Sequence, residues 1–200
     1  MRWMVVDGID GSGKSTIGKM ICDHYRERGE TTHMLTHPSD RFFGRISRQA
    51  LQGRGGVKKI VAATFYILDV LISVGKLRGL KSRYQNLVFV RYLMGTAYLP
   101  SSLARRGYKF FCKFLPVPER LLLVDIDPEV ALTRISSRDD GREMFEDLDS
   151  LVKVRNKVME LAAEGWEIVD NSGSQEETRS GVEEIIDRWD REEVSRSSSS

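Results

Sequence analysis

The sequence predicts an α/β fold: a doubly wound parallel sheet of about five strands with helices on both faces. Short apolar runs typical of buried strands recur along the 200 residues and alternate with amphipathic helical patterns. A glycine-rich stretch follows the first apolar run at once and leads into a helical pattern. Strands that alternate with helices in this way lie parallel, and the connecting helices cover the sheet.

The glycine-rich stretch, residues 8–15, fits the phosphate-binding loop (P-loop) pattern GxxxxGK[ST] after the strand-like run at residues 3–6. We expect Lys14 to reach the β- and γ-phosphates of ATP and the Ser15 hydroxyl to bind Mg²⁺. A glycine-rich turn with a chance lysine is the alternative, and the strand and helix on either side argue against it. The predicted phosphate contacts are Gly8, Gly11, Ser12, Gly13, Lys14, Ser15 and Thr16. Lys14 is expected to be exposed there.

The composition of the chain indicates which partners it binds and in which compartment it acts. Residues 1–120 hold 21 of the 31 Lys and Arg but only 8 of the 29 Asp and Glu, so this part of the chain attracts anions. Nucleotide phosphates satisfy that charge, and no nucleic acid is expected. The longest apolar stretch, residues 60–75, is short for a membrane span and contains Asp69, so we expect no transmembrane segment. No signal peptide is apparent and two cysteines make no disulfide framework, which favours a cytoplasmic protein.

Two further strands are predicted in the first half of the chain. Residues 32–35 precede a loop in which Pro38 disfavours helix. Residues 87–90 form a continuous apolar run that is followed at once by Arg91. Because ligands of open α/β sheets gather at the carboxyl ends of strands, Arg91 is placed where chemistry occurs.

Two helices are predicted between these strands. The first is short and carries Arg41, Arg45 and Arg48 on one face, either as a solvated surface or as a phosphate-binding row. The second covers residues 57–77, with Phe65 and Asp69 one turn apart.

The second half begins with a basic, aromatic stretch at residues 100–114, which suits an amphipathic surface helix, a membrane-surface patch or a nucleic-acid patch equally well. A strand at residues 121–125 then leads into a helix with an acidic cap and Pro128 in its first turn. The remaining expected elements are a polar loop at 138–142, a helix at 145–162, a strand at 166–169 and a helix at 182–189.

In this order the motifs resemble the thymidylate kinase family of nucleoside monophosphate kinases. The resemblance is carried by the Gly-Ile-Asp start of the loop, by residues 127–132 with Arg134, by the lid-like residues 138–145, by the turn at 170–172, and by Pro38 with Gly44 and Arg48. It implies one P-loop kinase domain over residues 1–194, with an acceptor-binding region at about 36–85 and a small mobile lid at about 136–146. The Ser-rich composition of residues 195–200 predicts a disordered tail.

The resemblance also implies a reaction, in which ATP and dTMP give ADP and dTDP with magnesium. By it, Lys14, Arg91, Arg138 and Arg142 are catalytic, and Asn171 and Ser172 lie near the adenine of ATP. Asp10 approaches the acceptor sugar and Phe65 stacks on the acceptor base. The implied acceptor contacts are Asp10, Pro38, Arg41, Arg48, Phe65, Asp69 and Tyr98.

Three features depart from the family pattern. The segment from Arg91 to Tyr98 is one residue shorter than that pattern, and Leu99 stands where a glutamine is common. Val90 stands where the family has an aspartate. Asp7, at the end of the neighbouring strand, is expected to replace that aspartate as a metal ligand beside Ser15. Asp69 stands where the family has an arginine that reads thymine. Because a carboxylate only accepts hydrogen bonds, Asp69 predicts weaker selectivity for thymidylate.

Other functions remain open at this point, because a fold does not determine a function. One alternative is a P-loop kinase for another nucleotide or small-molecule acceptor. The other is a nucleotide-binding regulatory protein without turnover. The expected partners are ATP and a nucleoside monophosphate, and a homodimer is one candidate for the oligomeric state.

Overall fold

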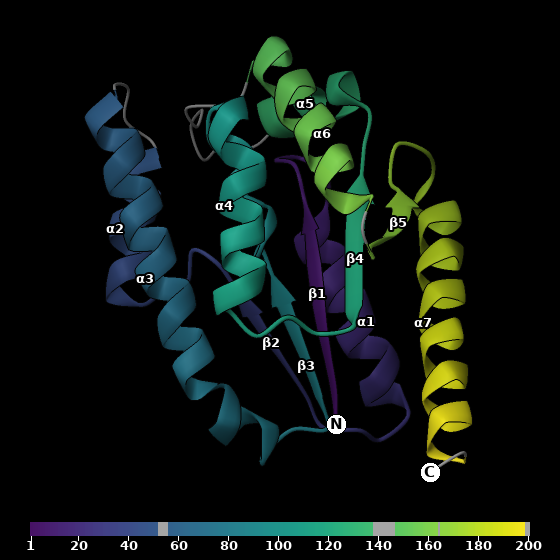
Figure 1. Cartoon of the computed structure of the whole chain (residues 1–200). Coiled ribbons are helices and arrows are strands. Elements are labelled where there is room, and N and C mark those ends of the chain that lie inside the picture. The colour runs from purple at the N-terminus through teal and green to yellow at the C-terminus, as the bar shows by residue number, and fades with distance from the viewer. Residues whose placement is uncertain (52–55, 138–146, 164, 199–200) are drawn as a thin grey trace.

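A computed structural model describes residues 1–51, 56–137, 147–163 and 165–198. Five parallel strands form one sheet in the order β2-β3-β1-β4-β5 (Figure 1). The strands span Arg2–Gly8 (β1), Thr32–Thr36 (β2), Asn86–Val90 (β3), Arg120–Asp125 (β4) and Glu167–Asp170 (β5). All the predicted strands are therefore confirmed, as is the α/β class.

The helices connect these strands. They span Lys14–Glu27 (α1), Phe42–Leu51 (α2), Gly56–Lys81 (α3), Ser101–Phe114 (α4), Pro128–Ser136 (α5), Leu148–Ala162 (α6) and Gln175–Ser197 (α7), with a short 3₁₀ helix, η1, at Met94–Tyr98. Helix α5 begins as the sequence predicts, because the Asp127 carboxylate caps it by accepting from the N–H groups of Glu129 and Val130.

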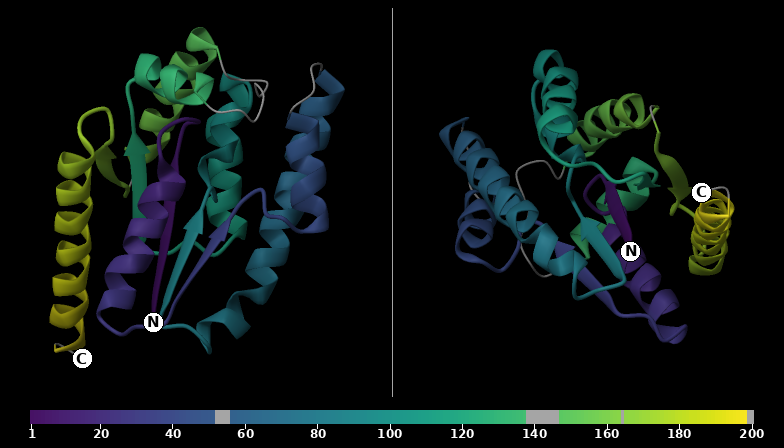
Figure 2. Two further views of the ribbon diagram at one scale, coloured as in Figure 1. Left: turned by 180° about the vertical axis from the view of Figure 1, so that it is seen from behind. Right: turned by 60° about the horizontal axis from the view of Figure 1, so that its bottom comes forward.

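The sheet is covered on both faces, as predicted. Along β1, Met4 and Val6 pack on the face covered by α1 and α7, and Trp3 and Val5 pack on the face covered by α3 to α6 (Figures 1 and 2). Side chains alternate between the two faces of a strand, so a continuous apolar run in a central strand fills both cores.

Helix α7 is longer than the sequence predicts. It begins at Gln175 because Ser174 and Glu177 form a reciprocal capping box. It then continues through Ser197, so residues 195–197, which were expected to be disordered, are helical.

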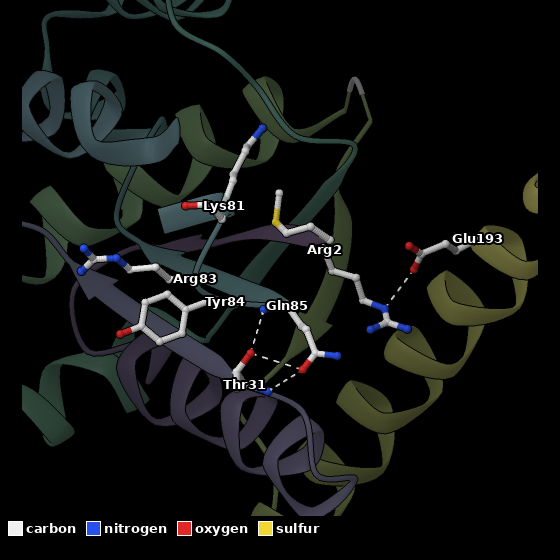
Figure 3. Close-up of a pocket in the computed structure, with 9 residues that line it drawn as sticks. Arg2, Thr31, Lys81, Arg83, Tyr84, Gln85 and Glu193 are labelled. Carbon is white, nitrogen blue, oxygen red and sulfur yellow. Dashed lines mark hydrogen bonds and ion pairs between the residues drawn. The ribbon is translucent and has the colours of Figure 1, made fainter. Parts of the chain in front are cut away.

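The amino ends of the strands lie at the end of the molecule opposite the phosphate-binding loop. There Gln85 accepts hydrogen bonds from the backbone and hydroxyl of Thr31, and Arg2 pairs with Glu193 at 2.9 Å (Figure 3). These groups border an open hollow of about 390 Å³. The contacts tie β1, the turn before β2 and α7 together at the base of the sheet.

Helix α4 turns its basic, aromatic stretch partly outward. Tyr108 is buried and accepts a hydrogen bond from the Trp166 indole at 2.8 Å, whereas Phe110 and Phe114 are 59% and 64% exposed. Helix α4 is therefore an amphipathic surface helix. No helix in the described part of the chain is long and apolar enough to cross a membrane.

We predict that Leu122→Ala in β4 lowers the free energy of unfolding by about 3 kcal/mol, because it leaves a cavity in a well-packed core. Leu122 is fully buried among side chains of the α1 and α7 face. Urea unfolding measures the change. Val194→Ala on α7, where the side chain is 64% exposed, is the control and should change stability little. Equal stability of both variants would contradict this account of the core.

Candidate active site

The phosphate-binding pattern forms the turn between β1 and α1. Gly11 and Gly13 adopt φ angles of 78° and 84°, a region that residues with a side chain rarely occupy. A Cβ on Gly11 would lie 2.7 Å from the Ala131 carbonyl oxygen of α5, and one on Gly13 would lie 2.4 Å from the Asn171 amide. Both glycines are therefore required by conformation and by close packing.

The Lys14 side chain is buried, contrary to expectation. Its ammonium group donates to the Ile9 carbonyl at 2.6 Å and lies 3.7 Å from the Asp10 carboxylate, and the residue is 4% exposed. An ammonium group buried in this way needs oxygen partners. Here the loop itself supplies them.

The hydroxyl groups of the loop differ in their surroundings. Ser15 and Thr16 are exposed in the first turn of α1. The Ser12 hydroxyl is buried and has no hydrogen-bond partner among the described residues. An unpaired buried hydroxyl at this position suits a site that receives an oxygen-rich ligand.

Arg91 follows β3 and turns toward the loop. Its guanidinium pairs with the Asp10 carboxylate at 2.6 Å, and the Tyr98 hydroxyl donates to the same carboxylate at 2.7 Å. Burial opposes ionisation of Asp10, but Arg91 and Lys14 outweigh it and hold the pKa of this carboxyl well below its usual range. The structure thus brings together four predicted site residues, Lys14, Asp10, Arg91 and Tyr98.

Asp7 has a structural role that the sequence did not reveal. One carboxylate oxygen accepts the backbone N–H groups of Tyr92, Leu93 and Met94 at 2.8, 2.9 and 3.0 Å, and the other accepts that of Gly8. These donors account for the buried carboxylate, so Asp7 is better explained as the anchor of the loop after β3 than as the expected metal ligand.

Val90 has no side-chain oxygen that could bind a metal ion. It is fully buried in the core beneath α1, where its side chain closely approaches Gly18. No group of three His, Cys, Asp or Glu side chains in the described ranges could hold a metal ion. The exposed Ser15 hydroxyl is therefore the predicted metal ligand that remains.

Asp69 does not extend toward a base as a free carboxylate. It is fully buried, accepts from the backbone N–H and the hydroxyl of Ser39 at 2.7 and 2.6 Å, and pairs with Arg41 at 3.0 Å. The premise of the predicted change in base selectivity is therefore incorrect. Arg41, the first arginine of the expected row, precedes α2 and turns to α3.

The remaining acceptor-side residues lie around α2 and α3. Phe65 stacks on Phe43 with ring centroids 5.7 Å apart. Pro38 and Arg41 border a hollow of about 680 Å³ along β2. The side chain of Arg48 lies outside the described part of the chain.

Asn171 supports the phosphate-binding loop. Its amide donates to the Ser12 carbonyl at 2.8 Å, and its oxygen accepts from the Thr178 hydroxyl at 2.9 Å. Ser172 accepts from the backbone N–H of Asp127 and donates to Asp170, which joins the β5 turn to α5. Asn171 therefore contacts the loop directly, whereas Ser172 contacts the residues at the start of α5 and the end of β5.

Arg134 is a site residue that the sequence marked only as part of a motif. It projects from α5, and its guanidinium lies 3.9 Å from the position of a Cβ on Gly13. Its position in the last turn of α5 was the available signal. The predicted lid arginines, Arg138 and Arg142, lie outside the described residues.

Comparisons with known proteins show similarity to thymidylate kinases over most of the chain. The family model described as thymidylate kinase matches residues 6–182. The chain is 31% identical over 163 residues to a thymidylate kinase of Leptospira borgpetersenii, covering 77% of this chain and 78% of that one. It is 30% identical over 199 residues to a probable thymidylate kinase of Pyrobaculum aerophilum, covering 94% and 97%. A solved thymidylate kinase structure from Candida albicans superposes with a TM-score of 0.70 at 18% identity, covering 94% and 91%.

We predict that Asp7→Asn lowers the free energy of unfolding by about 2 kcal/mol, because charge-assisted hydrogen bonds to buried backbone donors are lost. The Mg²⁺ concentration for half-maximal turnover should not change. Chemical unfolding and a magnesium titration measure the two effects. Asp23→Asn, on the surface of α1, is the control. A raised magnesium requirement without loss of stability would restore the metal role to Asp7.

Proposed function

This chain belongs to the thymidylate kinase family of phosphotransferases, and we propose that its phosphate-binding loop, Arg91 and the α2–α3 segment perform the family's reaction. That reaction transfers the γ-phosphoryl group of ATP to dTMP and gives dTDP and ADP. The observation that carries the proposal is the contact of Asp10 with both Lys14 and Arg91. Lys14, beside the expected ATP phosphates, and Arg91, beside the expected transferring phosphoryl group, thus meet at one carboxylate where β1 and β3 end.

On the donor side, ATP would draw Lys14 away from the Ile9 carbonyl and onto phosphate oxygens. The backbone N–H groups of the loop and the N-terminus of α1 would hold the same phosphates. Arg134 lies above the loop and would add positive charge. Asn171 would keep the loop in shape through the Ser12 carbonyl.

Magnesium fits the loop with one protein ligand, the Ser15 hydroxyl. Mg²⁺ commonly takes one or two protein oxygens and completes its shell with phosphate and water. When bound, the ion would offset the negative charge that the phosphates share during transfer.

On the acceptor side, we assign the sugar to Asp10 and Tyr98 and the base to the ring of Phe65. Pro38 and Arg48 would lie beside the acceptor phosphate. Arg91 would bridge the transferring phosphoryl group, where fixed positive charge stabilises the transition state. Arg138 and Arg142 would supply further positive charge to the same group, as the family resemblance implies.

The assembly and location are also proposals. We propose a homodimer, and a cytoplasmic location because ATP and dTMP are found there. Neither alternative, a kinase for another acceptor or a binding protein without turnover, gains support from the comparisons.

We predict that Lys14→Ala and Arg91→Ala each reduce dTMP-dependent ADP release by about 100-fold or more, because each removes positive charge from the transferring phosphoryl group. A coupled ADP-release assay measures this. Lys19→Ala on the exposed side of α1 is the matched control and should retain full turnover. Near-normal turnover of Lys14→Ala would refute the proposed site.

We predict that Asp69→Asn raises the KM for dTMP about five-fold, because the hydrogen bonds that hold Ser39 and Arg41 weaken by about 1 kcal/mol. Asp69→Arg should destabilise the protein without increasing its preference for dTMP, because it buries a second guanidinium beside Arg41. Steady-state kinetics with a panel of nucleoside monophosphates and thermal unfolding test this. Asp149→Asn on α6 is the control. A stable Asp69→Arg variant with sharper thymidylate preference would show that residue 69 reads the base.

A further inference from the structure

Arg91 has an unusual backbone that several groups hold in place. Its φ angle is 61°, in the left-handed region that residues other than glycine seldom occupy. Its N–H donates to the Val6 carbonyl at 3.0 Å. Its carbonyl accepts from the Tyr66 hydroxyl at 3.0 Å and contacts Nδ1 of His37 at 3.1 Å. Such a backbone persists only where its surroundings determine it strongly.

The contact with His37 is the end of a chain of hydrogen bonds. Arg41 Nη2 donates to the Ser73 hydroxyl at 2.5 Å, and Ser73 lies 2.7 Å from Nε2 of His37. A guanidinium only donates and a carbonyl only accepts. The ring proton therefore lies on Nδ1, facing the Arg91 carbonyl. The Ser73 hydroxyl lies closer to Nε2 of the neutral ring, at 2.7 Å, than to the Asp69 carbonyl, at 3.3 Å. With the hydroxyl proton directed at Nε2, the chain runs from Arg41 through Ser73 and His37 to the Arg91 carbonyl.

The ionisation of the two side chains suits this arrangement. Burial lowers the pKa of His37, Asp69 acts against it and Arg41 adds to it. The neutral ring has one donor and one acceptor nitrogen, as the chain requires. Burial, with Asp7 and Asp69 adding to it and Arg91 opposing, raises the pKa of Tyr66, so its hydroxyl keeps the proton that it donates.

We propose that Tyr66 and His37 are positioning residues for Arg91, and that the chain through Ser73 links the backbone of Arg91 to Arg41 of the acceptor segment. This inference rests on the role proposed above for Arg91. The two side chains fix the carbonyl on one side of residue 91, and the Asp10 ion pair fixes the guanidinium on the other. A displacement of Arg41 is thereby passed to the residue that acts on the transferring phosphoryl group.

The first experiment compares variants that remove single hydrogen bonds. Tyr66→Phe should lower kcat about five-fold, the effect expected for one buried hydrogen bond, with the KM for ATP and for dTMP within about two-fold of wild type. His37→Asn keeps an amide donor near the Nδ1 position, and His37→Gln keeps one near Nε2. His37→Gln should therefore lower kcat more than His37→Asn. Tyr84→Phe, at the opposite end of the sheet, is the control.

The second experiment is a double-mutant cycle with Arg91→Ala. If Tyr66 acts through Arg91, Tyr66→Phe should change kcat less than two-fold in the Arg91→Ala background. A five-fold loss in both backgrounds would show a general structural role and overturn the inference. A slow Arg91→Ala variant beside a fully active Tyr66→Phe variant would refute the inference alone. If the wild type turns over and the Arg91→Ala variant is equally active, the proposed role of Arg91 is refuted as well.

Discussion

A buried carboxylate at the end of the central strand organises the site. Asp7 belongs to β1, yet it binds the backbone of the three residues that follow Arg91 beyond the neighbouring strand. Burying this charge is costly, and the N–H groups that it accepts offset the cost. Because the phosphate-binding loop begins one residue later, the same contact fixes the distance between the loop and Arg91.

The two cations of the site have partners within the protein. Lys14 donates to the Ile9 carbonyl, and Arg91 pairs with Asp10. By the proposed function, nucleotide phosphates would offer oxygens to both cations, so binding would exchange internal partners for ligand oxygens instead of ordering a loose loop. Preorganisation of this kind reduces the entropy lost on binding. The two cations, Lys14 and Arg91, also keep Asp10 ionised, because they lower the pKa of its carboxyl.

How much of the site the sequence predicts depends on how local each interaction is. The phosphate-binding loop is encoded in eight consecutive residues, 8–15, and the strands are encoded in continuous apolar runs. By contrast, Asp7 meets Tyr92, and Asn171 meets Ser12, across long stretches of chain. The hydrophobic periodicity of the sequence does not reveal such long-range pairs. The spacing of the arginines in α2 likewise indicated one shared face, but did not show that Asp69 of α3 binds Arg41.

The two guanidinium–carboxylate pairs of the acceptor side differ in how readily they can open. The Asp69 carboxylate is fully buried and is also held by Ser39. Arg41 itself donates to the Ser39 hydroxyl, the Asp69 carbonyl and the Ser73 hydroxyl as well, so moving it would break several partly buried contacts at once. Asp10 keeps the hydrogen bond from the Tyr98 hydroxyl when Arg91 departs. We therefore expect Arg91 to exchange its carboxylate for the phosphoryl group during the reaction, while Arg41 stays paired and serves to hold the segment that carries it.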